Sequence, residues 1–221
     1  MAIVTIIGAI DQATVRSIRA ASAGDPDGEL LVVINSEGGD IQSAFDIASV
    51  IRSHRGGSHG RAVKECSSAG VLVLSACDRR SARPGSRFLL HSRSATTLPA
   101  RRTAVDLRER ADQLAEVDER CRRQISAAIG CRPAEIAALE RGEGTVLTAT
   151  EALDLGLIDT LVGCPELSRR AAQRRQARAR ARMPGSSPGE PAWRGVAARY
   201  LSARGASGVA IGLPPQWWVR P

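Results

Sequence analysis

The stretch Leu30-Leu31-Val32-Val33-Ile34-Asn35-Ser36-Glu37-Gly38-Gly39-Asp40 decides the fold class of this chain. It begins with an unbroken apolar run, which is typical of a strand buried on both faces of a sheet. The two glycines predict a turn, and beyond it apolar residues recur at helical spacing, at Ile41, Ala44, Phe45, Ala48 and Ile51. Asp40 stands where it can cap this helix. A buried strand, a turn and a helix in this order indicate an α/β protein.

The same alternation of short apolar runs and helical patterns continues from residue 2 to about residue 165. It predicts further strands over Ile3–Ile7, Arg61–Cys66 and Ser86–His91. A long helix is expected over Thr103–Ile129. Apolar side chains lie near one stripe of this helix and charged side chains fill its other faces, so one side should pack and the other should be solvated. The stripe consists of Leu107, Ala111, Leu114, Cys121 and Ile125.

The net charge of +8 is confined to the end of the chain. Residues 166–221 hold 11 arginines and two acidic residues, whereas the preceding part holds 20 basic and 21 acidic side chains. All three tryptophans also lie in this tail, with no pattern that would give it a core. We therefore expect one domain over residues 1–164 and an Arg-rich tail over 165–221 that is disordered or partly helical. A weak contact of the tail with nucleic acid or an acidic partner and a merely solvated tail both fit this composition.

Composition and spacing also disfavour several classes of protein. The cysteines are odd in number and form no C-x-x-C pair, which argues against a zinc site and against a disulfide framework. His54 and His59 share a Gly-Ser loop without further ligands, so we expect no metal and no cofactor. No apolar run approaches the ~18 residues that a membrane span needs, and the first residues lack the order of a signal peptide. A reduced, cytoplasmic setting without membrane contact is the simplest reading.

Two residues at the ends of predicted elements carry the candidate chemistry. Ser68 lies in Cys66-Ser67-Ser68-Ala69-Gly70, at a junction between a strand and a helix, where a serine most often serves as a helix cap. His91 closes the apolar run Arg87-Phe88-Leu89-Leu90, where a histidine is more often a satisfied core residue. A serine hydroxyl becomes a good nucleophile only when a base takes its proton, and histidine suits this role near neutral pH. Taken together, the two residues fit a serine hydrolase.

Several motifs, in uniform order, resemble those of the proteolytic subunit of Clp, a self-compartmentalised serine peptidase. Asn35-Ser36-Glu37-Gly38-Gly39 is similar to the family's Asn-Ser-Pro-Gly-Gly. Ser67-Ser68-Ala69-Gly70 resembles its Ala-Ser-Met-Gly, which makes Ser68 the nucleophile. Pro84-Gly85-Ser86-Arg87-Phe88-Leu89-Leu90-His91 is like its Pro-Asn-Ser-Arg-x-x-x-His, and Leu147–Ala152 with Gly156–Asp159 matches its closing motif.

The resemblance, which runs from about Ile3 to Val162, implies the ClpP/crotonase-like spiral of βαβ units with Thr103–Ile129 as its long handle helix. In the family such handles join rings of subunits into a closed chamber, so the resemblance implies a homo-oligomeric ring that degrades unfolded polypeptides. It also implies that Ser68 attacks the peptide carbonyl and that His91 takes and returns the proton. An AAA+ unfoldase is the implied partner, although the chain starts almost at its first strand, where the family carries a segment of axial loops.

The same resemblance implies an oxyanion hole and exposes one departure from the family. The amides of Gly38 and Ala69 would stabilise the oxyanion. Counting back from Leu147-Thr148-Ala149, the family's catalytic aspartate falls on Gly144, and Glu143 is the candidate carboxylate beside it. The sequence therefore leaves open an active serine endopeptidase, with or without an orienting acid, and a catalytically impaired subunit with a structural or regulatory role. A crotonase-like acyl-CoA enzyme is a further alternative, because it shares the spiral fold and the oxyanion hole.

Overall fold

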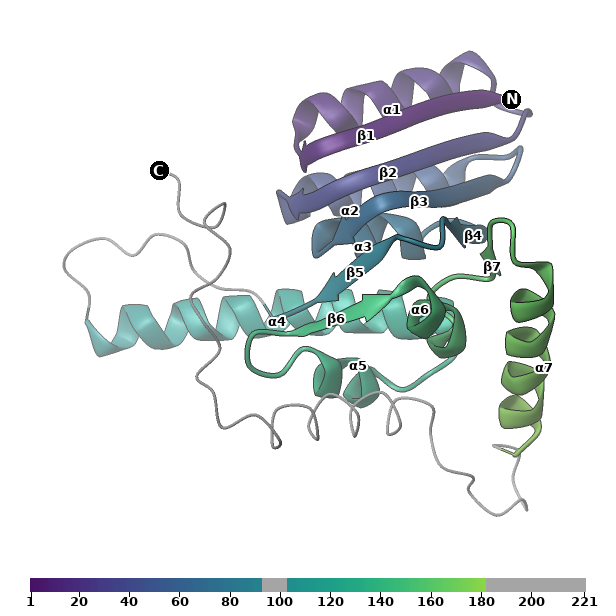
Figure 1. Ribbon diagram of the computed structural model, residues 1–221. Helices are drawn as coiled ribbons and strands as arrows, with labels where there is room; N and C mark the ends of the chain where they lie inside the picture. Colours follow the sequence, from purple (N-terminus) through teal and green to yellow (C-terminus); the bar gives the residue numbers. More distant parts are fainter. Residues whose placement is uncertain (93–102, 182–221) are drawn as a thin grey trace.

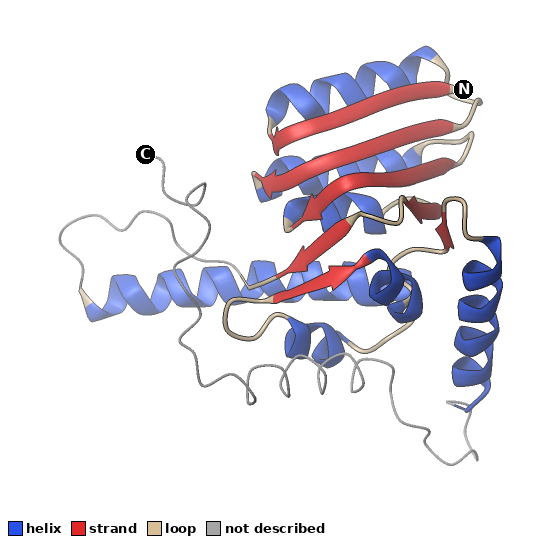
Figure 2. Cartoon of the chain, in the orientation of Figure 1, coloured by secondary structure: helices blue, strands red, loops and turns tan. Residues whose placement is uncertain are grey.

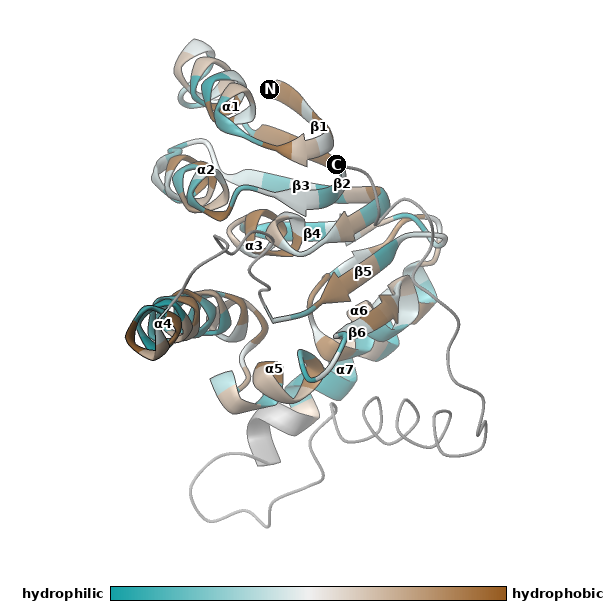
Figure 3. Cartoon of the chain, turned by 90° about the vertical axis from the view of Figure 1, so that its left-hand side faces the viewer, coloured by the Kyte–Doolittle hydropathy of each residue, from teal (hydrophilic) through white to brown (hydrophobic). Residues whose placement is uncertain are grey.

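The computed structural model describes residues 1–92 and 103–181, with side chains up to residue 177 (Figure 1). Its strands form one sheet, and helices α1, α2 and α3 lie along one face of that sheet (Figure 3). In chain order the elements are β1 (Ala2–Ile10), α1 (Gln12–Gly24), β2 (Leu30–Gly39), α2 (Ile41–Ser53), β3 (Ser58–Ser67), α3 (Ala69–Ser75), β4 (Arg79–Ala82), β5 (Arg87–Leu90), α4 (Ala104–Ile129), α5 (Pro133–Leu139), β6 (Thr145–Thr148), α6 (Ala149–Leu155), β7 (Thr160–Leu161) and α7 (Pro165–Ala181).

The sheet is parallel along the path β1-β2-β3-β4-β7 and divides at β3 (Figure 2). The first half of β3 pairs with β4, whereas its second half pairs in parallel with β5, with Ser67 opposite Leu89. Strand β6 then returns antiparallel to β5. Ser68 directly follows β3 and His91 directly follows β5. Because the two strands are parallel neighbours, the division of the sheet brings both predicted catalytic positions to adjacent strand ends.

The core lies between the sheet and its helices and consists mainly of aliphatic side chains. Strand β2 shows the pattern: Leu30, Val32 and Ile34 are fully buried, whereas the alternate residues Leu31 and Val33 are only partly buried. The expectation of complete burial on both faces is therefore met on one face only. The reason is that the helices cover one side of this part of the sheet.

Gly38 and Gly39 lie at the end of β2, where the sequence predicted a turn. They pair with Ala9 and Ile10 of β1 and so continue the parallel ladder. A side chain on Gly39 would collide with the backbone of Ile10, 2.5 Å from its nitrogen, which explains why glycine is needed here. The helix that follows begins as predicted, since the Asp40 side chain accepts a hydrogen bond from the Ser43 amide at 2.7 Å.

Helix α4 confirms the predicted long helix, with Thr103 as its N-cap. Only its second half packs against the body of the chain, where Cys121 and Ile125 are buried. Its first half extends beyond the sheet (Figure 1), so Leu107 and Ala111 of the predicted apolar stripe are exposed. Neither α4 nor any other helix within residues 1–92 and 103–181 is long and apolar enough to span a membrane.

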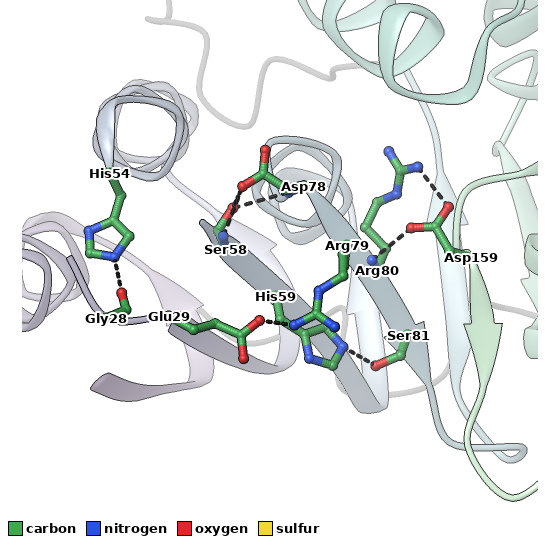
Figure 4. A network of polar contacts seen from close by, with 10 residues as sticks. All are labelled: Gly28, Glu29, His54, Ser58, His59, Asp78, Arg79, Arg80, Ser81 and Asp159. Carbon is green, nitrogen blue, oxygen red and sulfur yellow. Dashed lines mark hydrogen bonds and ion pairs between the residues drawn. The ribbon is translucent and has the colours of Figure 1, made fainter. Parts of the chain in front are cut away.

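An ion pair between Arg80 and Asp159 ties three distant segments together (Figure 4). The Asp159 carboxylate accepts from the Arg80 guanidinium at 3.0 Å and from the Arg80 backbone N–H at 2.8 Å. The same guanidinium donates to the carbonyl oxygen of Ala128 at 2.9 Å. Asp159 therefore serves the closing turn before β7. It anchors this turn to β4 and to the end of α4.

Helix α7 occupies the start of the segment for which the sequence predicts disorder or a partial helix. Arg174 pairs with Asp154 at 2.7 Å, and Arg175 donates to the carbonyl oxygen of Leu153 at 2.9 Å. Disorder is thus not what the structure shows for Pro165–Ala181. The physical reason is that arginine side chains of this stretch bind α6 and its surroundings. No periodic pattern in the sequence predicts this contact. The rest of the tail lies outside the described residues.

Replacing Asp159 by asparagine should destabilise the fold. The change removes the charge opposite Arg80, whose side chain is only 10% exposed. Breaking a buried pair from one side costs about 3–5 kcal/mol, and the partial exposure of Asp159 reduces the expected loss to about 2 kcal/mol in a urea titration. Asp27→Asn is the matched control, because its pair with Arg55 is largely exposed and should contribute less than about 0.5 kcal/mol. Equal effects of the two substitutions would contradict this assignment.

Candidate active site

Ser68 has an unusual backbone conformation. Its φ of 53° and ψ of −119° make it the one non-glycine residue with positive φ within residues 1–92 and 103–181. Such a conformation costs roughly 1–3 kcal/mol and persists only where its surroundings enforce it. Here the Ser68 amide donates to the carbonyl oxygen of Leu89 at 2.8 Å. The side chain makes no capping hydrogen bond to α3, so the ordinary structural role of a serine at this place is not used.

The end of β2 passes directly against this serine. Gly38 has a φ of 113°, and a Cβ added to it would lie 2.8 Å from the Ser68 Cβ and 3.3 Å from the Ala69 nitrogen. The Gly38 amide, predicted to belong to an oxyanion hole, donates to the Ser36 hydroxyl at 3.0 Å. That hydroxyl in turn donates to the carbonyl oxygen of Gly8 at 2.6 Å. Gly38 and Ala69 are thus brought together beside Ser68, with one of the two amides already engaged.

His91 lies at the carboxyl end of β5 and is half-buried. Its Nδ1 atom lies 2.8 Å from the carbonyl oxygen of Ser92. His91 and Ser68 line the same cavity, together with Ala69 and Leu72 of α3 and with Asp118 and Cys121 of α4. The structure therefore brings the predicted nucleophile and the predicted base to one pocket, next to a largely apolar wall.

Gly144 touches the backbone of His91, where the family's aspartate was expected. Its φ is 85°, and a Cβ added to it would lie 2.5 Å from the His91 Cβ and would collide with the Leu90 carbonyl oxygen. The contact follows from the antiparallel pairing of β5 and β6, in which Leu90 faces Thr145. The glycine at position 144 therefore lets the chain pass close to His91, and it provides no carboxylate. Glu143 is exposed on the turn before it.

Glu140 is a buried acid at this pocket that no motif in the sequence indicates. Its carboxylate accepts from Arg122 Nε of α4 at 2.5 Å, and its carbonyl oxygen accepts from the Ser92 hydroxyl at 3.4 Å. Burial acts to lower the pKa of Arg122, but the hydrogen bond and charge of Glu140, with Asp118, outweigh it and hold this pKa above its usual value. In the sequence, Glu140 precedes Arg141 after a short helix and resembles a surface residue. No periodic signal marks it.

The other candidate groups have structural roles. Burial raises the pKa of the Cys66 thiol, and it raises the pKa of Cys77 to about 12, so neither thiol is a candidate nucleophile. His54 lies between the Ser22 hydroxyl and the Gly28 carbonyl oxygen, which are 2.9 and 2.7 Å from its ring nitrogens. His59 bonds the Ser81 hydroxyl at 2.8 Å (Figure 4). The two histidines therefore support loops and strands.

Comparison with known proteins assigns the family. Residues 2–164 match the Clp protease family. The proteolytic subunit 3 of the ATP-dependent Clp protease from Rhizobium etli is 29% identical over 162 residues, which make up 71% of this chain and 81% of that protein. The corresponding subunit 3 from Rhizobium johnstonii is 30% identical with the same shares.

Solved structures agree on the fold. A ClpP1 mutant from Listeria monocytogenes superposes with a TM-score of 0.65 at 20% identity, covering 75% of this chain and 94% of that chain. The protein is an α/β protein with the fold of ClpP, and it belongs to the Clp protease family. The resemblance in the sequence motifs is thereby confirmed.

Gly144→Ala should disturb His91, because the new methyl group would collide with the Leu90 carbonyl oxygen and press on the His91 Cβ. We expect a loss of roughly 2–3 kcal/mol in stability, the sum of a positive-φ penalty and of overpacking. Gly163→Ala is the control: its φ is 77° and nothing lies within 4 Å of the added Cβ, so it isolates the backbone penalty of about 1 kcal/mol. Equal losses in chemical denaturation would show that the contact with His91 is unimportant.

Proposed function

We propose that the protein is a serine endopeptidase that hydrolyses peptide bonds in unfolded polypeptides. The observation that carries this proposal is the position of Ser68, which is strained, makes no capping bond and shares a cavity with His91. Conformations of this kind cluster at active sites and ligand-binding sites, where the surrounding structure enforces them. Membership of the Clp protease family supports the peptidase class.

In the proposed reaction, Ser68 Oγ attacks the peptide carbonyl while His91 accepts the hydroxyl proton and later returns it to the leaving amine. The Ala69 N–H and the Gly38 N–H stabilise the oxyanion, and removing one such donor typically costs about 3 kcal/mol of barrier. The Gly38 amide must exchange its bond to the Ser36 hydroxyl for the substrate oxygen. The Ser36 hydroxyl keeps its partner at Gly8, so this exchange leaves no buried hydroxyl without a bond.

Gly144 gives weight to a second candidate, a catalytically impaired subunit with a structural or regulatory role. Loss of the orienting aspartate costs about 10⁴-fold in turnover in a well-studied serine protease. Glu143 remains the predicted carboxylate in its place, exposed on the turn beside the Gly144–His91 contact. Probe labelling distinguishes an active site from an impaired one.

A fluorophosphonate probe should label the folded protein at Ser68, and Ser68→Ala should abolish the labelling. Ser67→Ala is the matched control, because the Ser67 hydroxyl donates to the Glu65 carboxylate and Ser67 is not among the residues that line the cavity of Ser68 and His91. We expect this control to keep the labelling rate within about threefold, as is usual for a substitution outside a site. Absence of labelling in the folded wild-type protein would leave the impaired subunit as the function.

We also propose a homo-oligomeric ring, a Clp ATPase as the unfoldase partner, and a cytoplasmic location. The names of the related proteins describe ATP-dependent proteases. The projecting half of α4 supports assembly, since Val105 and Leu107 are 58% and 47% exposed on it. Exposed apolar side chains on a protruding helix are typical of a contact with another subunit. A weak nucleic-acid or acidic partner of the tail remains a proposal for residues beyond α7.

Leu107→Glu should reduce the assembly to smaller species, because it places a charge on the projecting half of α4 where we expect a partner helix to pack. Native mass spectrometry at micromolar concentration measures this directly. Leu167→Glu on α7 serves as control, since Leu167 is 38% exposed and lies elsewhere on the molecule. If both variants retain the wild-type mass, α4 does not form the subunit interface.

A further inference from the structure

The ring of His91 has a hydrogen-bond partner that restricts its chemistry. Its Nδ1 atom lies 2.8 Å from the carbonyl oxygen of Ser92, and this is the hydrogen bond that the ring makes within the described residues. A carbonyl oxygen can only accept, so Nδ1 must carry the proton. In the neutral ring the lone pair then lies on Nε2. This is the tautomer in which a histidine can act as base toward a serine through Nε2.

Ser92, which carries this carbonyl, is held in place by a hydrogen bond to a residue outside β5. The Ser92 hydroxyl donates to the Glu140 carbonyl oxygen at 3.4 Å, and the Glu140 carboxylate is bound by Arg122 of α4. Gly144 lies against His91 and leaves no room for a side chain of its own. The histidine and the residue that follows it are thus confined between β5, the end of α5 and the turn before β6.

A serine protease normally uses a carboxylate to hold Nδ1–H and to stabilise the imidazolium that forms. The structure excludes a side chain at position 144, because its Cβ would collide with the Leu90 carbonyl oxygen. A neutral acceptor can still fix the tautomer and the ring orientation. It stabilises the imidazolium less, since a hydrogen bond to a charged acceptor is about twice as strong as one to a neutral acceptor.

We propose that the main-chain carbonyl of Ser92 takes the orienting part of the missing aspartate, so that Ser68 and His91 act as a dyad positioned by the backbone. The proposal rests on the proposed peptidase function and adds the group that sets the tautomer of its base. Ser92 is a positioning residue here. The alternative is that Glu143 holds Nδ1, and the two possibilities make different predictions for the same variants.

The tautomer of His91 can be read directly by NMR. The chain has only three histidines, so a protein labelled with ¹⁵N-histidine gives three ring patterns in a long-range ¹H–¹⁵N correlation spectrum. At a pH where the rings are neutral, we expect the Nδ1–H pattern for His91. His54 provides the opposite reference, because its Nε2 faces the Gly28 carbonyl oxygen and must carry the proton (Figure 4). His91→Gln and His54→Gln assign the two patterns.

Glu143→Gln separates the two orienting groups. If the Ser92 carbonyl holds Nδ1, the variant keeps the Nδ1–H pattern of His91 and labels with the fluorophosphonate probe within about tenfold of the wild-type rate. If Glu143 is the acid, labelling falls by more than tenfold, toward the roughly 10⁴-fold loss known for an aspartate-to-asparagine change. A larger loss than tenfold, or an Nε2–H pattern for His91 in the wild-type protein, overturns the proposal.

The spectroscopic result does not depend on activity. A wild-type protein that shows the Nδ1–H pattern but never reacts with the probe would refute the peptidase function while leaving the backbone orientation of His91 established. In that case the retention of the pattern in Glu143→Gln alone decides between the two orienting groups. A protein that reacts with the probe but shows the Nε2–H pattern would keep the function and refute the role of Ser92.

Discussion

Close backbone contact around Ser68 and His91 is the constraint on which the rest of the structure depends. Gly38 passes against Ser68 and Gly144 passes against His91, both with positive φ and without room for a side chain. To bring these four segments together, the sheet must divide at β3 so that β5 lies beside its second half, and β6 must return antiparallel to β5. The helices then cover the face that this arrangement leaves apolar. The geometry of the site therefore depends directly on the topology of the sheet.

The same constraint explains the departure from the usual triad. A chain that approaches His91 as closely as Gly144 does has no space for a carboxylate at that position. The main-chain carbonyl of Ser92 lies close to the base, the Ser92 hydroxyl binds the Glu140 carbonyl oxygen, and the Glu140 carboxylate binds Arg122. The buried ion pair of Glu140 and Arg122 therefore adjoins the segment that carries His91. The expected consequence is a base with a defined orientation and a weaker stabilisation of its charged form.

Much of this could be predicted from the sequence, and the exceptions have physical reasons. The run from Leu30 to Asp40 and the long helix from Thr103 carry strong periodic signals, and the structure has both elements. Strands β4, β6 and β7 are two to four residues long and owe their existence to pairing partners far away in the chain, which no local pattern encodes.

Among the residues of the candidate site, Ser68, His91, Gly38 and Gly144 could be located from the ordered motifs in the sequence. Glu140 does not, because its burial depends on an arginine 18 residues away. The sequence left disorder and partial helix open for the segment of α7 for a similar reason, since its arginines gain partners only in the folded chain. The central claim is that Ser68 and His91 act on one carbonyl group. A peptide chloromethyl ketone tests this claim most directly. Such a reagent alkylates the base only after the nucleophile has engaged its carbonyl. Peptide mapping should place the adduct on His91 in the wild-type protein and find none in Ser68→Ala. An unmodified His91 in the folded, assembled wild-type protein would contradict the account.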